Sequence, residues 1–575
     1  MPSGYRVIIK NITSLLKRIL PKYKIEIFLF FYFILIFIFY SWTTLTNSQS
    51  FLHVDDREIW VVSHNIYKNH SLTFEEPLHE YFDNKVFYTL DYALIGNKVV
   101  PRRSFGIYFL TAFGFLFGEN GPFYLISILG LACSIFLYLF IKNLFDKKIA
   151  LLSTVLFSSS FPIINWSNML FNNIPAFSFY IIGLFFFSEV PVKKRNKLIF
   201  YLLATIFFSL SIWFRYEYIL FVLLLIVWIL KDRKYINFKY LIISIIVLII
   251  ILLPILLLNN YLYKSPFLIG YNIKTYERIK KKITDNEESS LNTIARIIEG
   301  LVFTFKTFSQ KLSRVNINII LHNYKNFIFY LFPQILPFAL FGLIYALKSE
   351  NKNIASFTIY SIFILIFWMF YIMRGYNFGG KESIAGASNI RYLFLTYLCM
   401  ILFSTYMSFK LFNRLHKRLI YFITILIIIV SILNTINLSF FGKLGVVETH
   451  KRKEYLNNID NAVKSLPSNS IIINDIFTFS IGIRSRKVLD MRMIYRPSAI
   501  TDIDSLSPKT NVTEVVDNTI KYIKILLDLN YPVYILEKNY FNLLEKIEEK
   551  EEILDTKKVI SGDYFELHKV FYKEK

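Results

Sequence analysis

The chain has 575 residues, of which 55% are hydrophobic and 18% aromatic, and its formal net charge is +24. This apolar content exceeds that of ordinary soluble domains and indicates an integral membrane protein. The Lys and Arg residues lie between apolar runs instead of forming one stripe with stacking aromatics, which argues against a nucleic-acid partner. Both cysteines, Cys133 and Cys399, fall inside apolar runs, so no disulfide framework or zinc site is predicted.

Apolar runs of membrane-spanning length, or close to it, predict about eleven transmembrane helices. The first run, Ile25 to Trp42, is too long for a signal peptide and lacks the small-residue cleavage site of one, so it is a predicted span. The remaining runs lie at 122–144, 149–166, 173–190, 198–214, 216–230, 240–263, 327–347, 353–373, 391–409 and 419–441. The predicted fold is therefore an α-helical polytopic membrane protein.

The connections between these runs predict the topology. Alternate connections are basic, among them KNLFDKK and PVKKRNK, and basic loops stay on the cytoplasmic side. We therefore expect a multi-pass protein of the cell membrane with a cytoplasmic N-terminus and outer loops at 44–121 and 264–326. The run at 104–118 is shorter than a straight span needs, and counting it would place both basic connections outside. It predicts a juxtamembrane or re-entrant helix against the outer leaflet, with an ordinary short span as the alternative.

Residues 442–575 form a second predicted domain, because the composition changes after the transmembrane domain at 1–441. Acidic and basic residues balance there, and the β-type runs SIIIND, KVLDM, PVYILE and YFELHKVFY alternate with helical stretches. This pattern predicts a soluble α/β domain on the non-cytoplasmic side, where the topology puts the C-terminus. The domain has no Gly-rich phosphate loop, so no nucleotide site is assigned to it.

The first candidates for chemistry lie in the first outer loop. Asp55 and Asp56 follow the first span directly, where paired carboxylates could act as a general base or hold a divalent cation. A solvated turn or a helix N-cap is the alternative interpretation of this pair. Arg102 and Arg103 come late in the same loop, so acidic and basic side chains are offered side by side. The other ionisable residues considered in this loop are Glu58, Glu75, Glu76, His79 and Glu80.

Cations recur at the outer ends of later spans. Arg215 and Glu217 lie between two apolar runs, where ionisable residues are costly unless they pair or serve a function. A structural ion pair between them and phosphate binding by Arg215 both remain open. Lys264 and Arg391 also border spans, and with Arg215 they could surround an anionic lipid headgroup. Taken singly, each cation could instead be a snorkelling interface residue.

The order of these motifs resembles the GT-C superfamily of polyprenyl-phosphate-sugar glycosyltransferases, in particular its protein mannosyltransferase and aminoarabinose-transferase branch. HVDDREIW is similar to the acidic pair after the family's first span, and VVPRRSFGIYFLTAFGFLFGENG is similar to its juxtamembrane stretch. NNYLYKSPFLIGYN resembles a later Asn–Tyr, Ser–Pro and Gly–Tyr segment, and Arg391–Tyr392 resembles the opening of a late span. The resemblance covers most of residues 20–410. One departure is Asn173, where many relatives carry an acidic residue, and this weakens the case for a carboxylate-bound metal.

The resemblance implies a membrane glycosyltransferase that moves a sugar from a dolichyl or undecaprenyl phosphate to a protein, lipid or glycan acceptor on the non-cytoplasmic face. Asp55 would be the general base of an inverting displacement, Asp56 would orient it or help to bind a divalent cation, and cations would stabilise the leaving phosphate. The implied substrate-binding residues are Glu75, Glu76, Arg102, Arg103, Asn173, Arg215, Glu217, Lys264, Tyr271 and Arg391. A transporter or flippase, or a ligase, of lipid-linked glycans is the alternative, although the internal repeats and broken helices typical of transporters are not clear in the sequence.

Overall fold

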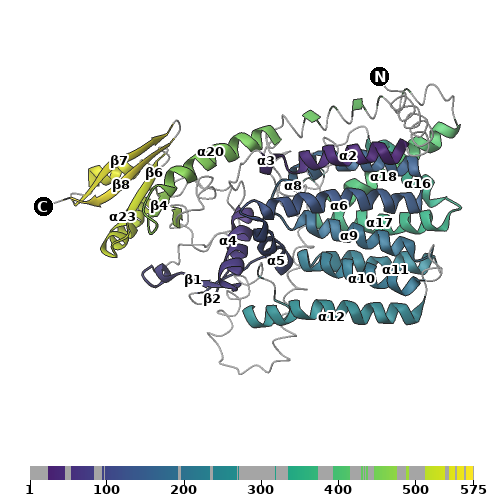
Figure 1. Cartoon of the computed structure of the whole chain (residues 1–575), viewed down its shortest axis with the longest axis horizontal. Coiled ribbons are helices and arrows are strands. Elements are labelled where there is room, and N and C mark those ends of the chain that lie inside the picture. The colour runs from purple at the N-terminus through teal and green to yellow at the C-terminus, as the bar shows by residue number, and fades with distance from the viewer. Residues whose placement is uncertain are drawn as a thin grey trace, which may run out of the picture.

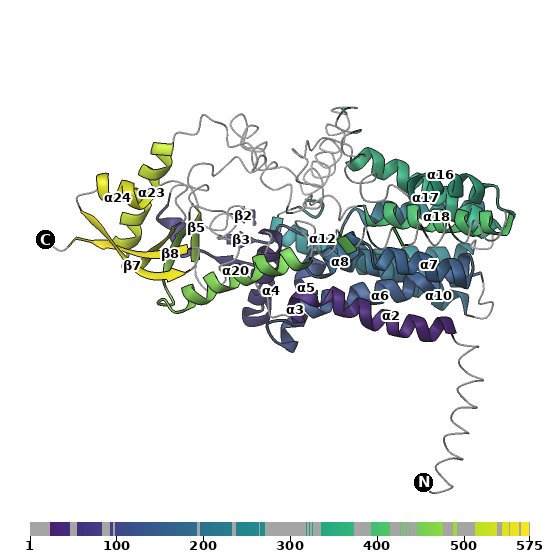
Figure 2. The same ribbon diagram turned by 90° about the horizontal axis from the view of Figure 1, so that it is seen from above.

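A computed structural model of the chain describes residues 24–45, 54–82, 93–95, 98–191, 196–232, 237–263, 265–268, 270, 335–372, 393–414, 446–474, 487–490, 512–537, 543–550, 553–562 and 565–573, with isolated positions between 318 and 437. Its long helices form a bundle, and a second unit built on a β-sheet lies beyond one end of that bundle (Figure 1 and Figure 2). Elements of the predicted first outer loop lie between the two units. Most of the candidate residues that the structure describes lie at this end of the bundle.

The bundle confirms the predicted polytopic architecture. Among the described residues, four helices are long and apolar enough to cross a membrane, or five if one bent pair counts as a span, so the number eleven stays a prediction. Helix α12 exposes a row of Ile and Leu side chains along its length, as expected of a lipid-facing helix. The bundle helices are α2 (Lys24–Tyr40), α6 (Gly121–Leu144), α7 (Lys147–Ser158), α8 (Phe161–Ser167), α9 (Asn173–Glu189), α10 (Lys197–Phe214), α11 (Tyr218–Lys231), α12 (Phe238–Tyr263), α16 (Ile335–Leu347), α17 (Lys352–Ile372) and α18 (Phe394–Arg414).

The run predicted as one span at 149–166 is divided in the structure. Helices α7 and α8 meet at a bend of 58°. Pro162 explains the break, because it has no N–H to donate to the carbonyl of Ser158 four residues earlier. The hydroxyl of Tyr40 on α2 donates to that carbonyl instead, at 2.8 Å. A backbone group freed by the break is thus bonded from a neighbouring helix.

The described elements of the predicted first outer loop form a layer across the end of the bundle. Helix α5 has only 10 residues, which confirms a helix too short for a straight span, and it packs against α4, α6 and α10. Helix α4 ends at Asn69, and the next residue, His70, has a positive φ of 53°, the left-handed conformation that commonly stops a helix. The elements of this layer are α3 (Trp42–Leu45), α4 (Val54–Asn69), β1 (Phe74–Glu75), η1 (Pro77–Glu80), β2 (Ala93–Ile95), β3 (Lys98–Val100), α5 (Phe105–Gly114) and η2 (Phe115–Phe117).

The C-terminal unit is an α/β domain with a five-stranded sheet in the order β5-β4-β6-β8-β7. Strands β5, β4 and β6 are parallel, and β8 and β7 continue the sheet in antiparallel pairing. The four predicted strand runs correspond to β4, β5, β6 and β8, whereas β7 was not predicted. The elements are α20 (Val446–Lys464), β4 (Ile471–Asn474), β5 (Lys487–Asp490), α23 (Val512–Asp528), β6 (Val533–Glu537), α24 (Leu543–Lys550), β7 (Leu554–Gly562) and β8 (Phe565–Tyr572).

Candidate active site

The acidic pair opens helix α4. Asp55 and Asp56 lie in its first turn, since the helix begins at Val54. Asp56 is buried, with 1% of its surface exposed, so it does not lie in a solvated turn. The first turn of a helix carries partial positive charge from the helix dipole, which stabilises a carboxylate there. The side chain of Asp55 lies outside the described part of the structure.

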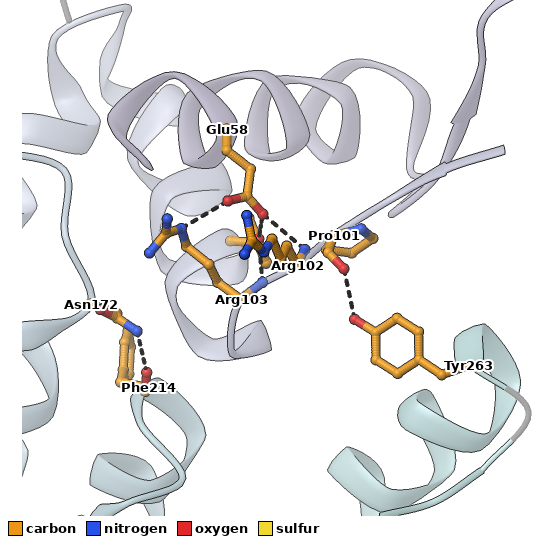
Figure 3. Close-up of polar contacts among 8 residues, drawn as sticks. Glu58, Pro101, Arg102, Arg103, Asn172, Phe214 and Tyr263 are labelled. Carbon is orange, nitrogen blue, oxygen red and sulfur yellow. Dashed lines mark hydrogen bonds and ion pairs between the residues drawn. The ribbon is translucent and has the colours of Figure 1, made fainter. Parts of the chain in front are cut away.

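Glu58, on the same helix, is the centre of a buried polar cluster (Figure 3). Its Oε1 accepts hydrogen bonds from the Tyr108 hydroxyl and, at 2.8 Å, from the backbone N–H of Arg102. Its Oε2 accepts the Nε–H of Arg103, also at 2.8 Å, to form a buried ion pair. Burial raises the pKa of Glu58, while the Arg103 guanidinium and the Tyr108 hydroxyl act to lower it. These donors compensate the buried carboxylate and hold α4 against the Arg102–Arg103 segment.

The end of α12 meets the same segment, as Figure 3 shows. Tyr263 donates its hydroxyl to the carbonyl of Pro101 at 2.8 Å and stacks on Phe105 with ring centroids 6.2 Å apart. Gly270 lies so close that a Cβ there would come within 2.5 Å of the Arg102 carbonyl oxygen. Tyr263 and Pro101 belong to two different motifs of the family resemblance and are 162 residues apart in the sequence. Their hydrogen bond shows that the two motifs are in contact. Lys264 and Tyr271 belong to the later motif but lie outside the described residues.

The turn between α10 and α11 is close to the cluster, because Phe109 of α5 contacts Trp213 of α10 with ring centroids 6.2 Å apart. In this turn the Nη2 of Arg215 lies 3.0 Å from the Oε1 of Glu217, so the ion pair, one of the two interpretations of these residues, is present. The amide of Asn172 donates to the carbonyl of Phe214 at 3.0 Å (Figure 3). The next residue, Asn173, begins α9 and is buried.

Two other predicted binding residues, Glu75 and Glu76, form separate ion pairs. Glu75 forms an exposed ion pair with Lys98 at 3.9 Å, whereas the buried Glu76 pairs with Lys487 of the C-terminal domain at 2.6 Å. Arg391 lies outside the described residues, so the convergence of Arg215, Lys264 and Arg391 around one phosphate stays a prediction.

The sequence left open whether a divalent cation binds here, and the side chains that could act as its ligands bear on this question. Among the described residues there is no group of three or more His, Cys, Asp or Glu side chains that could hold one. Among the described acidic residues of this layer, Glu58 is the one nearest in sequence to the Asp55–Asp56 pair. Its carboxylate already accepts hydrogen bonds from three donors.

Sequence reasoning placed Glu58 in the right loop but gave it no role. The only signal was the presence of acidic and basic residues in one outer loop. That signal does not say which carboxylate meets which guanidinium, because Glu58 and Arg103 are 45 residues apart.

Comparisons with known proteins bear on the family and the fold. Residues 104–257 match the family model described as dolichyl-phosphate-mannose-protein mannosyltransferase. Among curated proteins, none matches the sequence. In structure, the chain is similar to the oligosaccharyltransferase of Archaeoglobus fulgidus in the apo form, with a TM-score of 0.51 and 13% identity over 88% of this chain and 69% of that chain.

The same archaeal enzyme in complex with an inhibitory peptide and a dolichol-phosphate matches with a TM-score of 0.50 and 12% identity, over 91% of this chain and 70% of that chain. ArnT from Cupriavidus metallidurans bound to undecaprenyl phosphate is a weaker likeness, with a TM-score of 0.44 and 10% identity over 94% and 98% of the two chains. Residues 104–257 thus carry the sequence pattern of the dolichyl-phosphate-mannose-protein mannosyltransferases, and the chain is an integral membrane protein with the fold of the GT-C glycosyltransferases.

Proposed function

We propose that this protein transfers a sugar from a polyprenyl-phosphate carrier to an acceptor on the outer side of the membrane, with Asp55 as the general base. The observation that carries the proposal is the meeting of three segments at one end of the bundle. They are helix α4, whose first turn is acidic and whose Glu58 makes the contact, the Arg102–Arg103 segment and the end of α12. A lipid carrier needs a site at the membrane boundary, and this layer lies where the apolar helices end (Figure 1).

The two arginines of the cluster have different roles in this proposal. Arg103 is 5% exposed and its Nε–H is bonded to Glu58, so it holds the segment in place. The Arg102 side chain is partly exposed, and its backbone N–H donates to Glu58. We assign the Arg102 guanidinium to the phosphate of the carrier, because it lies at the membrane end of the bundle and a guanidinium matches phosphate oxygens with two parallel hydrogen bonds.

The reaction is a single displacement. The acceptor hydroxyl or amine attacks the anomeric carbon, and its proton passes to the Asp55 carboxylate. The bond between the anomeric carbon and the phosphate oxygen breaks, and the polyprenyl phosphate leaves with the electron pair. Arg102 stabilises the negative charge that this leaving group gains, so no general acid is required. Attack on the face opposite the leaving group inverts the anomeric centre.

The decisive test replaces Asp55 by Asn, which keeps the shape of the side chain but cannot accept the proton. Removing a general base typically costs about 10²–10⁴-fold in turnover, so Asp55→Asn should lose that much sugar transfer in proteoliposomes. Binding of polyprenyl phosphate, measured by native mass spectrometry, should stay close to that of the unmodified protein. Asp56→Asn should lose less turnover if Asp56 only orients the base.

The matched control is Glu26→Gln, which removes an exposed carboxylate that pairs with Lys147 at 3.0 Å. It should leave transfer unchanged. If Asp55→Asn has normal turnover, Asp55 is not the general base. If the unmodified protein transfers no sugar from any polyprenyl-phosphate donor, the proposed function itself is refuted.

A further inference from the structure

Residues 71–82, which we call the strap, join the two hydrophobic cores of the protein. At the start of the strap, Leu72 and Phe74 pack against the core of the helix bundle. At its end, Leu78 and Phe82 are 1% and 3% exposed and belong to the core of the C-terminal domain. Phe82 meets Tyr522 of α23 edge-on, with ring centroids 4.9 Å apart. The chain therefore crosses from one core to the other between Phe74 and Leu78.

An ion pair of Glu76 with the C-terminal domain holds the strap at this crossing. It is 3% exposed, and its Oε1 lies 2.6 Å from the Nζ of Lys487, the first residue of β5. The same oxygen accepts the backbone N–H of Leu78 at 3.2 Å and so caps η1. A buried carboxylate is stable only with such partners, so moving the C-terminal domain away from the strap would leave Glu76 without its counter-charge.

The strap is also bonded to both halves of the candidate site. Strand β1 pairs with β3 in the register Phe74↔Val99, and β3 runs directly into Pro101 and the two arginines. On the other side, the amide of Asn65 on α4 donates to the carbonyls of Ser71 and Thr73 at 2.6 and 3.2 Å. The helix that carries the acidic pair and the segment that carries the cations thus share one connection to the C-terminal domain. Figure 2 shows β2 and β3 between that domain and the bundle.

We propose that the C-terminal domain sets the geometry of the transfer site through the strap, with Glu76, Leu78 and Phe82 as positioning residues. The inference rests on the proposed function, because it concerns how that site is held. The domain touches neither the reacting sugar nor the carrier in this scheme. It keeps α4 and the Arg102–Arg103 segment in one arrangement, and a displacement of about 1 Å at a reacting group can cost about 10²-fold in rate.

The test breaks the Glu76–Lys487 pair in the full-length protein in proteoliposomes. Lys487→Glu should lower turnover by about 10²-fold and speed hydrogen exchange in peptides covering residues 54–60 and 98–104. The charge swap Glu76→Lys with Lys487→Glu should restore both measurements most of the way. A role in folding alone predicts less folded protein but normal turnover in each molecule that folds. The control is Lys558→Glu, which breaks the exposed pair of Lys558 with Glu566 on the same domain and should change neither measurement.

Lys487→Met serves as a milder variant if Lys487→Glu does not fold, and it should change both measurements in the same direction. Turnover and exchange at the level of the unmodified protein in Lys487→Glu or Lys487→Met would overturn the inference, as would a charge swap that restores neither. Hydrogen exchange needs no substrate. A protein that shows the exchange changes but transfers no sugar would therefore refute the proposed function while leaving the link between the domains in place.

Discussion

Replacing Glu58 by Gln should loosen the candidate site without changing its shape. The two oxygens of Glu58 have separate partners, which makes the effect calculable. A Gln oxygen in the place of Oε1 keeps the bonds from the Arg102 N–H and the Tyr108 hydroxyl. The Gln amide in the place of Oε2 then faces the Nε–H of Arg103, so two donors meet and the ion pair is lost.

The magnitude follows from burial. Arg103 is 5% exposed, and removing one partner of a buried ion pair costs about 3–5 kcal/mol because the other charge stays buried and uncompensated. At about 1.36 kcal/mol for each factor of ten, the local opening of the Arg102–Arg103 segment becomes about 10²–10⁴ times more frequent. Tyr108→Phe removes the hydrogen bond donated to Glu58, worth about 1.5–3 kcal/mol, and the one accepted from the backbone N–H of Arg103 at 2.9 Å, worth about 0.5–1.5 kcal/mol.

Hydrogen exchange followed by mass spectrometry on peptides covering residues 98–108 measures this opening directly. We expect exchange to be faster in both Glu58→Gln and Tyr108→Phe than in the unmodified protein. Adding Arg103→Met to Glu58→Gln removes the stranded charge and should recover much of the protection. Exchange in Glu58→Gln within about threefold of the unmodified protein, far below the factor expected from burial, would refute this reasoning.

Three further predictions concern other parts of the molecule. Gly270→Ala should lower sugar transfer by about 10²-fold, because the added Cβ pushes on the backbone of Arg102; unchanged transfer would show that this contact does not position the site. Gly342→Ala should destabilise the bundle by about 1–3 kcal/mol, since its Cβ would lie 1.9 Å from a carbonyl oxygen of α18, and a thermal-stability assay in detergent with no shift would contradict this. Burial lowers the pKa of His64 below its usual 6.5, so the folded state favours the neutral ring. The stability that the neutral ring contributes is therefore present above pH 6.5 and is lost as the pH falls through the lowered pKa. The fluorescence of Trp60, which stacks on His64 at 4.8 Å, should therefore change with a midpoint below 6.5, and a midpoint above 6.5 would be inconsistent.

The sequence predicted elements better than contacts. The runs around Ile471 to Ile473 and Val533 to Leu536 are continuous and apolar because these strands are covered on both faces, and such runs are visible without a structure. Strand β7 was missed since its stretch LDTKKVISG is polar, as suits a strand at the edge of the sheet.

The site was predictable as a set of residue types but not as an arrangement. Asp55, Asp56, Arg102 and Arg103 could be chosen because they border apolar runs on one predicted side of the membrane. The role of Glu58 could not, because local periodicity carries no information about a partner in another segment. Leu78 and Phe82 are a similar case: they are isolated apolar residues in a polar loop, and only the fold of the distant domain gives them a core to enter.

The order of synthesis matters at the break between α7 and α8. With 12 residues in α7, the break lies about 18 Å along the helix from its start, well inside a hydrocarbon layer of about 30 Å. A bare carbonyl at that depth costs several kcal/mol, and no water is there to bond it. The hydroxyl that bonds the Ser158 carbonyl belongs to Tyr40, 118 residues earlier, so α2 has already left the ribosome when the break is made. If α7 and α8 were synthesised before α2, the Ser158 carbonyl would have no hydrogen-bond partner in the lipid. The N-terminal position of α2 avoids that state.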